Sequence, residues 1–284
     1  PNSKLEFDGC EFSQNNATLD GGACYFEQNN SVVMTNCVFN DNRASNNGGA
    51  IVVQSNLTIT GCHFSNCKSQ NSQFYIHTDL TGVVCLFNHC SFSYSKEEID
   101  SNSTRAVYVD GNIFVSFNTC NFTNYTKGST GFLVTTNEEC SYFPMIVSCI
   151  FQGLYGDSLI YCPIAQRIEF SMCIFEDCNL SGQHGTIIEC PQATTFIIQN
   201  NEFRNVHSSN GSIKHISNST QQQRIEISEN RFINCGTIQI YIDSQFARCN
   251  FDHLYFINCS YDDPIYGMKL IHTQSLSVVD CEWE

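Results

Sequence analysis

Residues 56–64 read NLTITGCHF, and the same pattern recurs as KLEFDGCEF at residues 4–12, RIEFSMCIF at residues 167–175 and RIEISENRF at residues 224–232. In the first of these stretches the apolar residues Leu57 and Ile59 are two positions apart. Cys62 follows three residues after Ile59, and Phe64 two residues after Cys62. Asn replaces the Cys in the last stretch. Side chains two positions apart lie on one face of a strand, so the pattern predicts two short strands separated by a bend. Recurrence along the chain indicates that one structural unit is used many times.

The aromatic position of this unit can be followed through the whole chain at spacings of 24–30 residues. It is occupied in order by Phe12, Phe39, Phe64, Phe92, Phe122, Phe151, Phe175, Phe203, Phe232, Phe256 and Trp283. The position two residues earlier holds Cys10, Cys37, Cys62, Cys90, Cys120, Cys149, Cys173, Asn201, Asn230, Leu254 and Cys281. The position three residues before that column is apolar in every unit. These columns predict a continuous core made of identical residues from successive units.

Short strands repeated every 24–30 residues bury their apolar faces only when the units stack on one another. We therefore predict an all-β fold, a right-handed single-stranded parallel β-helix of about eleven coils that forms one domain over residues 1–284. The hand follows from the preference of parallel β crossovers. A second strand is expected before each unit, as in GGAIVVQ at residues 48–54, and helices are expected to be absent or marginal. Propellers and leucine-rich repeats have different repeat lengths and signatures.

The composition restricts the partners of the chain. It has 13 Lys and Arg against 28 Asp and Glu, a formal charge of −15, which argues against nucleic acid and against anionic membrane surfaces. Its 18 cysteines indicate an oxidising compartment. The chain has no signal peptide and no apolar run of 18 residues, so we expect a segment of a longer surface protein without direct membrane insertion.

N-glycosylation sequons of the form N-x-[ST] are also frequent in the sequence. They occur at Asn16, Asn29, Asn56, Asn102, Asn121, Asn124, Asn179, Asn210, Asn218 and Asn258. Most fall where the repeat predicts turns or outward positions, and an attached glycan must be solvated. With the cysteines, the sequons predict an extracellular or cell-surface glycoprotein that passes through the secretory pathway.

Two short motifs alternate in the first 70 residues: GGAC at residues 21–24 and GGAI at residues 48–51, and FSQN at residues 12–15 and FNDN at residues 39–42. This alternation resembles the repeat of the chlamydial polymorphic outer membrane proteins (Pmp) and, especially, of similar surface proteins of trichomonad protists. The resemblance implies an adhesin-like, extracellular β-helix used in attachment or antigenic display. Further along the chain GGA shrinks to forms such as HGT, and the Asn of FxxN becomes Cys67, Cys178, Cys235 or Cys259.

The cysteine column permits two interpretations, a metal or redox site and a small buried side chain repeated in every coil. Free Cys is among the most buried residue types and no CxxC motif occurs, so core packing is the favoured interpretation. Two other pairs occupy matching places on neighbouring coils, Cys162 with Cys190 and Cys235 with Cys259. Stacked coils bring Cα atoms within disulfide range, so these pairs are the candidate disulfides.

A carbohydrate-active enzyme needs carboxylates clustered on adjacent coils. The best column lies four residues after the Cys position, but its two aspartates, Asp41 and Asp177, are five coils apart, roughly 24 Å at the spacing of strands. We therefore predict no catalytic residue, no cofactor and no metal site. The longest departures from the repeat, near residues 93–106, 125–142 and 260–270, are candidate binding loops or plain surface decoration.

The sequence thus predicts a non-enzymatic, adhesin-like β-helix module that displays loops and N-glycans for adhesion or protein–protein interaction. Its expected partners are a protein or glycan on a cell surface, or neighbouring copies of itself. Two alternatives stay open, a β-helix polysaccharide lyase or hydrolase and a subunit of an extracellular filament or coat.

Overall fold

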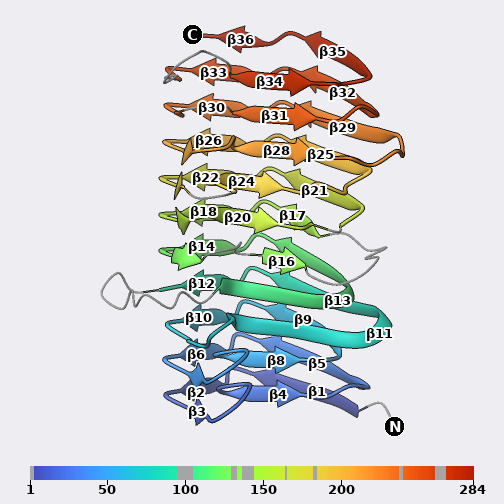
Figure 1. Cartoon of the computed structure of the whole chain (residues 1–284). Coiled ribbons are helices and arrows are strands. Elements are labelled where there is room, and N and C mark those ends of the chain that lie inside the picture. Colours follow the sequence, from blue (N-terminus) through green and yellow to red (C-terminus); the bar gives the residue numbers. More distant parts are fainter. Residues whose placement is uncertain are drawn as a thin grey trace.

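The computed structural model describes residues 3–94, 105–128, 133–135, 144–163, 165–181, 184–236, 239–259 and 267–284. Every regular element in these ranges is a β-strand, and the strands pair in parallel. Figure 1 shows the strands stacked in successive layers from the N-terminal end to the C-terminal end. The predicted parallel β-helix is confirmed. Within the described ranges there is no helix of the length and apolar character needed to cross a membrane.

The Cys-x-Phe segments form one sheet, which counts eleven strands in the described residues. They are β2 (Glu11–Ser13), β6 (Val38–Asn40), β10 (His63–Ser65), β12 (Ser91–Ser93), β14 (Asn121–Thr123), β18 (Ile150–Gln152), β22 (Ile174–Glu176), β26 (Glu202–Arg204), β30 (Arg231–Ile233), β33 (Tyr255–Ile257) and β36 (Glu282–Trp283). Neighbours in this sheet come from consecutive repeats, so one strand of each coil lies directly on the next.

The apolar segments before each Cys-x-Phe unit, and the strands before those, belong to a 19-stranded sheet. The strands nearest the Cys-x-Phe units are β1 (Ser3–Asp8), β5 (Asn30–Thr35), β9 (Asn56–Thr60), β17 (Met145–Val147), β21 (Arg167–Ser171), β25 (Thr195–Gln199), β29 (Gln223–Ser228), β32 (Ala247–Asp252) and β35 (Ser275–Val279). The preceding strands are β4 (Cys24–Phe26), β8 (Ile51–Val53), β16 (Leu133–Thr135), β20 (Ser158–Tyr161), β24 (Thr186–Glu189), β28 (Ile213–Ile216), β31 (Ile240–Asp243) and β34 (Met268–Ile271). Two long strands, β11 (Ser72–Asn88) and β13 (Arg105–Asn118), pair with both groups and join them.

Short strands close the third side of the solenoid. A four-stranded sheet contains β15 (Thr126–Gly128), β19 (Tyr155–Gly156), β23 (Asn179–Leu180) and β27 (His207–Ser208), and a two-stranded sheet contains β3 (Asn16–Ala17) and β7 (Arg43–Ala44).

The aromatic column forms one continuous stack of rings inside the solenoid. Each ring from Phe12 to Trp283 lies parallel to the next, with centroids 4.7–5.0 Å apart. The spacing is that of neighbouring strands, because residues in register pair directly across the sheet. The rings from Phe39 to Phe256 are at most 1% exposed, whereas Trp283, in the last strand, is 51% exposed.

Two corners of the coil use a residue in the left-handed backbone region, the first in all eleven coils and the second in nine of them. The first corner immediately precedes the Cys column, and its residues all have φ between +48° and +65°: Gly9, Asn36, Gly61, His89, Thr119, Ser148, Met172, Asn200, Glu229, His253 and Asp280. The second corner lies two residues after the aromatic position and has the same conformation at Gln14, Asp41, Asn66, Asn124, Gly153, Asp177, Asn205, Asn234 and Asn258. Asn, Asp and Gly tolerate this region best, which explains their frequency there.

The Cys column does more than fill space, because its side chains satisfy the backbone at the first corner. The thiol of Cys37 donates to the carbonyl of Phe7 in the preceding coil at 3.7 Å, and the N–H of Cys37 donates to Sγ of Cys62 in the following coil at 3.2 Å. Asn201 makes the same pair of contacts, accepting from Cys173 N–H at 2.9 Å and donating to the Phe170 carbonyl at 3.3 Å. Cys and Asn share this column because each has a polar group at the right reach from the backbone.

The second corner has an equivalent ladder, and its members are the Asn of FxxN and its cysteine replacements. Asn42 accepts from the N–H of Asn15 at 3.0 Å and donates to the carbonyl of Phe12 at 2.7 Å. Cys67 donates to the Phe39 carbonyl at 3.6 Å and Cys235 to the Phe203 carbonyl at 3.3 Å. The change from Asn to Cys along the chain therefore preserves the hydrogen bond that the corner needs.

Burial keeps the thiols of Cys62 and Cys249 protonated. Desolvation raises the pKa of Cys62, a member of the column, to about 12, and it also raises that of Cys249, in the core strand β32, to about 12. A thiol with such a pKa stays neutral at physiological pH and is a poor nucleophile or metal ligand. This agrees with a structural role for these two cysteines.

Met172 is expected to be a mildly unfavourable residue at the first corner, where two other coils use Gly and two use Asn. Its φ is +55° and its side chain is 55% exposed, so it carries a conformational penalty without compensating burial. Met172→Gly should raise the free energy of unfolding by up to about 1 kcal/mol. A non-Gly residue in the left-handed region costs about 1–2 kcal/mol. The greater conformational entropy of glycine in the unfolded chain offsets part of this gain. Urea denaturation measures the change, and a destabilised variant would contradict this account of the corner.

Candidate functional site

The described sequon asparagines lie mostly at the surface. Seven are exposed, namely Asn16, Asn29, Asn56, Asn121, Asn179, Asn218 and Asn258. Asn124 and Asn210 are half-buried, and Asn102 lies outside the described residues. Exposed asparagines have the solvation that a glycan requires, so glycosylation stays a prediction that this geometry permits.

The two candidate disulfide pairs are brought side by side as free thiols. The Cys162 thiol lies close enough to that of Cys190 to raise its pKa, and the Cys259 thiol does the same to that of Cys235. Cys162, Cys190 and Cys235 are buried, whereas Cys259 is half-buried. The fold therefore places the two thiols of each pair next to each other. That they form a disulfide stays a prediction.

Cys259 is expected to be the more reactive thiol of its pair. The contact with Cys235 lowers the pKa of Cys259 below its ordinary value, while the same contact raises the pKa of Cys235. Cys259 should therefore alkylate faster than Cys281, whose pKa is raised by burial. Mass spectrometry after brief iodoacetamide treatment at neutral pH checks this. Equal rates at both thiols would count against it, and Cys235→Ser should slow the alkylation of Cys259.

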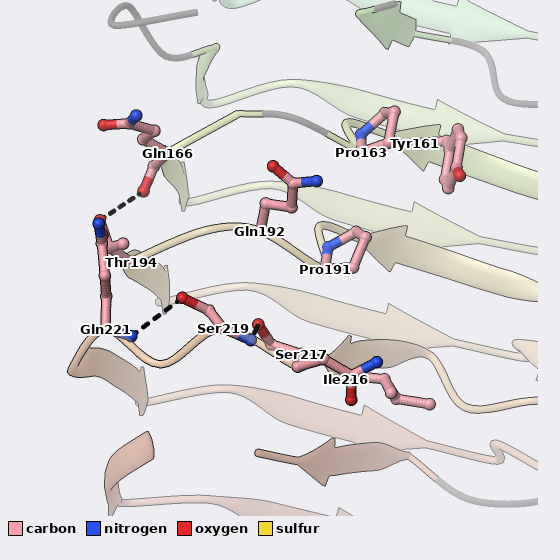
Figure 2. A pocket seen from close by; sticks show the side chains of 11 residues that line it. Tyr161, Pro163, Gln166, Pro191, Gln192, Thr194, Ile216, Ser217, Ser219 and Gln221 are labelled. Carbon is pink, nitrogen blue, oxygen red and sulfur yellow. Dashed lines mark hydrogen bonds between the residues drawn. The ribbon is translucent and has the colours of Figure 1, made fainter. Parts of the chain in front are cut away.

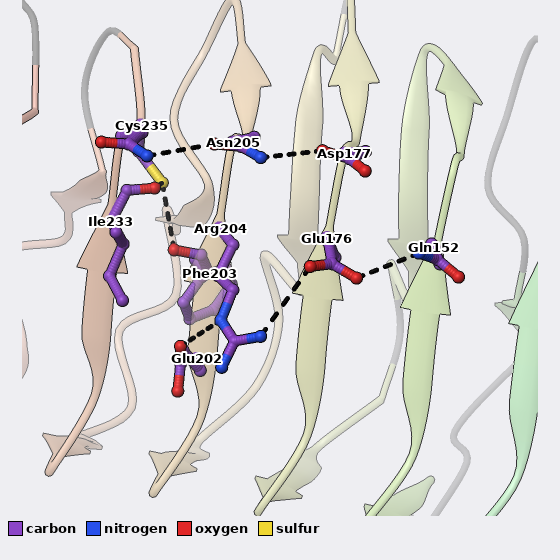
Figure 3. A network of polar contacts seen from close by, with 10 residues as sticks. Gln152, Glu176, Asp177, Glu202, Phe203, Arg204, Asn205, Ile233 and Cys235 are labelled. Atoms are coloured by element: carbon purple, nitrogen blue, oxygen red, sulfur yellow. Dashed lines mark hydrogen bonds and ion pairs between the residues drawn. The ribbon is translucent and has the colours of Figure 1, made fainter.

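The column that was considered for a catalytic carboxylate pair is the second corner. Asp177 and Asn205 occupy left-handed positions, and Asn205 donates to Oδ1 of Asp177 at 2.9 Å (Figure 3). Beside them, Gln152 donates to Glu176 at 3.0 Å, and Glu176 lies 3.8 Å from Arg204. These side chains form a surface ladder of amides and ion pairs, so the column is explained by backbone conformation and not by catalysis.

A groove crosses three successive coils on one side of the solenoid. It is formed by the loops after β20, β24 and β28 and has a volume of about 670 Å³. Its described lining consists of Tyr161, Pro163, Gln166, Pro191, Gln192, Thr194, Ile216, Ser217, Asn218, Ser219 and Gln221. Figure 2 shows these residues on three loops stacked one above another. Volumes of this size are typical of small-molecule sites in proteins.

Hydrogen bonds within and between the loops hold the groove in shape. The carbonyl of Gln166 accepts from the N–H of Thr194 at 2.7 Å and from its hydroxyl at 3.1 Å. Within the third loop, Ser217 accepts from the N–H of Ser219, and Ser219 accepts from the N–H of Gln221 (Figure 2). The groove is therefore part of the folded scaffold.

A charged cluster from three coils lies next to the groove at Tyr161. Glu189 is 6% exposed, and its two carboxylate oxygens contact His184 Nδ1 at 2.9 Å and Lys214 Nζ at 3.0 Å. The ring of Tyr161 packs against that of His184 with centroids 4.7 Å apart. Both oxygens of Glu189 are already paired, so the carboxylate is committed to this network and not presented to a substrate.

A buried polar cluster supports the groove from inside. His215 is fully buried, with Nδ1 2.8 Å from the carbonyl of Cys190 and Nε2 3.2 Å from Oε1 of Gln223. Gln223 donates to Ser217 of the groove lining at 2.7 Å and accepts from Ser244. Interior hydrogen bonds thus fix Ser217 at the groove surface.

Acid is expected to weaken the protein through His215. Desolvation lowers the pKa of His215 in the folded state below its ordinary value of 6.5, so the unfolded chain binds the proton more readily. The contribution of neutral His215 is fully present above pH 6.5 and is lost as the pH falls below it. The free energy of unfolding should therefore decrease between pH 7.5 and pH 5, and His215→Gln should reduce that decrease. An unchanged pH dependence in the variant would contradict the role of His215.

One described group has the ligand atoms to hold a metal ion. His253 Nδ1 lies 2.6 Å from Asp252 Oδ1, and His253 Nε2 lies 3.8 Å from Asp280 Oδ2. His253 and Asp280 are both first-corner residues with left-handed backbone, which accounts for their proximity on consecutive coils. All three side chains are accessible to solvent.

The sequence did not reveal the groove or the charged cluster. Their residues come from three repeats and share no common spacing, since Gln166 and Gln221 lie five residues after the preceding strand and Gln192 lies three residues after it. A signal existed in the repeated Cys-Pro at residues 162–163 and 190–191, which marks two of the three loops. Of the loops predicted for binding, residues 95–104, 129–132, 136–143 and 260–266 lie outside the described residues.

Comparison with protein-family models gives one match, to the Chlamydia polymorphic membrane protein repeat, at residues 9–27 and 36–54. The matches begin at the first-corner residues Gly9 and Asn36 and end just after β4 and β8, so each covers the same part of a coil. The expected resemblance to this repeat is confirmed in the N-terminal region. No curated protein matches the chain.

Proposed function

We propose that this β-solenoid with Pmp-type repeats is a non-enzymatic, adhesin-like module of an extracellular or cell-surface protein. Polymorphic membrane proteins are surface proteins, and the repeat match suggests the same setting for this chain. The observation that carries the proposal is the continuous stack of coils whose interior is occupied by aromatic rings and corner hydrogen bonds. A scaffold of this kind leaves recognition to its outer surface and loops.

The surface chemistry supports an extracellular role. Seven described sequon asparagines are exposed, as N-glycans require. The net charge of −15 favours solubility and disfavours polyanionic partners. The expected partners are accordingly a protein or glycan on a cell surface, or neighbouring copies of the chain.

A polysaccharide-active enzyme receives less support from the geometry. Glu189 is the carboxylate of the charged cluster beside the groove, and its oxygens are held by His184 and Lys214. Glycoside hydrolysis needs a carboxylate free to exchange a proton with the sugar, usually with a second carboxylate opposite it. The Glu189 network is better explained as a satisfied ion cluster on the outer surface.

Cell binding and turnover assays separate these functions. Fluorescently labelled protein should bind intact cultured epithelial cells in a saturable manner, and unlabelled protein should displace it. The same protein should release no new reducing or unsaturated ends from pectin, alginate or hyaluronan. Turnover of any of these polysaccharides would overturn the non-enzymatic proposal, and cell binding that does not saturate would overturn the adhesive one.

A further inference from the structure

We propose that the groove lined by Tyr161, Gln192 and Gln221 binds a neutral saccharide. The inference deepens the proposed function, since it gives the extracellular module a defined recognition site and a class of ligand. It rests on the composition of the groove, on its repetition over three coils and on its rigidity.

The lining selects for a neutral ligand. Among its described residues none has a carboxylate, ammonium or guanidinium group. In the charged cluster next to Tyr161, Glu189 and Lys214 neutralise each other at 3.0 Å. A charged ligand would lose its hydration without gaining a counter-charge, which is unfavourable.

The polar groups of the lining match sugar hydroxyls. The side-chain amides of Gln166, Gln192 and Gln221 each offer donors and an acceptor, and all three residues are exposed. A sugar hydroxyl likewise donates and accepts, so one amide can engage two adjacent hydroxyls. Tyr161, the two prolines and Ile216 supply the apolar surface against which the C–H face of a sugar ring can pack.

The groove repeats with the coils. Each of its three loops contributes one exposed glutamine, and the first two also contribute a proline at the same place after the strand, Pro163 and Pro191. Coils stack at roughly 4.8 Å. A pyranose ring is about as long as one coil is high, so a short oligosaccharide lying along the solenoid axis can present one ring to each loop.

The site is also formed before any ligand arrives. The Gln166 carbonyl bonds to Thr194, the serines brace the third loop, and His215 and Gln223 hold Ser217 from the interior. Preorganised sites lose less conformational entropy on binding, which matters most for ligands that bind through a few hydrogen bonds.

The saccharide has two possible sources, and both present the same chemistry. Asn218, in the sequon Asn218-Ser219-Thr220, lines the groove and is exposed, so a glycan attached there can fold into it. Alternatively, a glycan on another molecule occupies the site. The two arms of the test separate these sources.

The first arm uses unglycosylated protein made in bacteria and a panel of N,N′-diacetylchitobiose, mannobiose, lactose and cellobiose. At least one should bind by saturation-transfer NMR and isothermal titration calorimetry. The double variant Gln192→Ala and Gln221→Ala should weaken binding by about tenfold or more, because the hydrogen bonds of two amides to the ligand are lost. Gln199→Ala, on β25 outside the groove lining, is the matched control and should leave affinity unchanged.

The second arm uses protein from a glycosylating eukaryotic host and follows amide hydrogen exchange at residues 190–194 and 217–222. If the resident sugar is the Asn218 glycan, enzymatic trimming or Asn218→Gln should speed exchange in both loops, whereas Asn179→Gln should not. Saccharide binding in the first arm without such an effect assigns the site to an external glycan.

The proposal is overturned if no saccharide of the panel binds at millimolar concentration and glycan removal leaves both loops unchanged. It is also overturned if bound saccharide is unaffected by the double variant. Cell binding by the unmodified protein distinguishes this failure from that of the proposed function, since adhesion by a protein that binds no saccharide refutes only the groove.

Discussion

Phe151→Ala is expected to lower the free energy of unfolding by about 3–5 kcal/mol, the cost of removing a fully buried aromatic side chain. Its ring is stacked on Phe122 and Phe175 at 4.9 Å on either side and is fully buried. The free-energy cost combines the lost burial of the ring with the cavity that remains between two closely packed neighbours. Equilibrium urea denaturation followed by circular dichroism measures the effect.

Trp283→Ala is the matched control for this prediction. Trp283 stacks on Phe256 at 5.0 Å, but it is the last aromatic of the column and is 51% exposed. Its removal should cost less than half as much as that of Phe151, because about half of its surface is already in water. Equal losses at the two positions would show that the rings do not form a continuous interior stack.

Asn201→Ala is expected to cost about 2–4 kcal/mol, because the substitution leaves a buried donor and a buried acceptor without partners. Asn201 accepts from the backbone N–H of Cys173 and donates to the carbonyl of Phe170, and it is 1% exposed. A smaller side chain cannot replace either contact, and the corner is too tightly packed for easy entry of water. Urea denaturation again provides the measurement.

The informative comparison for this corner is Asn201→Cys. The thiol of Cys173 already makes the corresponding contact to the Ile146 carbonyl at 3.6 Å in the preceding coil. Cysteine at position 201 should therefore retain more than half of the stability that alanine loses. If Cys and Ala were equally damaging, the ladder would depend on volume or on the amide group alone, and the equivalence of Cys and Asn at the corners would be wrong.

The sequence predicted the fold because the packing constraint repeats. Each Phe of the column faces the same environment in every coil, so eleven occurrences of one spacing reveal the sheet without any single strong motif. The corners were less visible, because a left-handed residue can be Gly61, Thr119 or Met172. Their chemistry is a backbone conformation, which several side chains tolerate at different cost.

For the cysteine column, the sequence predicted the burial of the side chains but not their hydrogen bonds. Core packing was the favoured interpretation, and burial of residues such as Cys120 agrees with it. The structure adds that the thiol donates to the Phe87 carbonyl at 3.5 Å, a contact whose partner lies 33 residues earlier. Hydrogen bonds between coils depend on register in three dimensions, so spacing in the sequence could suggest neighbouring positions but not donors and acceptors.

The groove could not be predicted for a related reason. Tyr161 ends β20, Gln192 and Gln221 lie on the loops after β24 and β28, and the three residues converge only because their coils stack. Binding residues on loops escape the periodicity that identifies core residues, since solvent-facing positions are not constrained by packing. The scaffold is thus predictable from the sequence, whereas the groove is found only in the three-dimensional structure.

In a solenoid of stacked coils, the distance between two residues of one column is proportional to the number of coils that separate them. Glu11, Asn121 and Arg231 are exposed and lie in one column, with four coil steps from the first to the second and eight from the first to the third. Spin labels attached through unnatural amino acids allow pulsed electron paramagnetic resonance to measure both distances without modifying the native cysteines. The account predicts about 19 Å for Glu11 to Asn121 and about 38 Å for Glu11 to Arg231, from roughly 4.8 Å per coil. Two distances that do not double with the number of coils would contradict it.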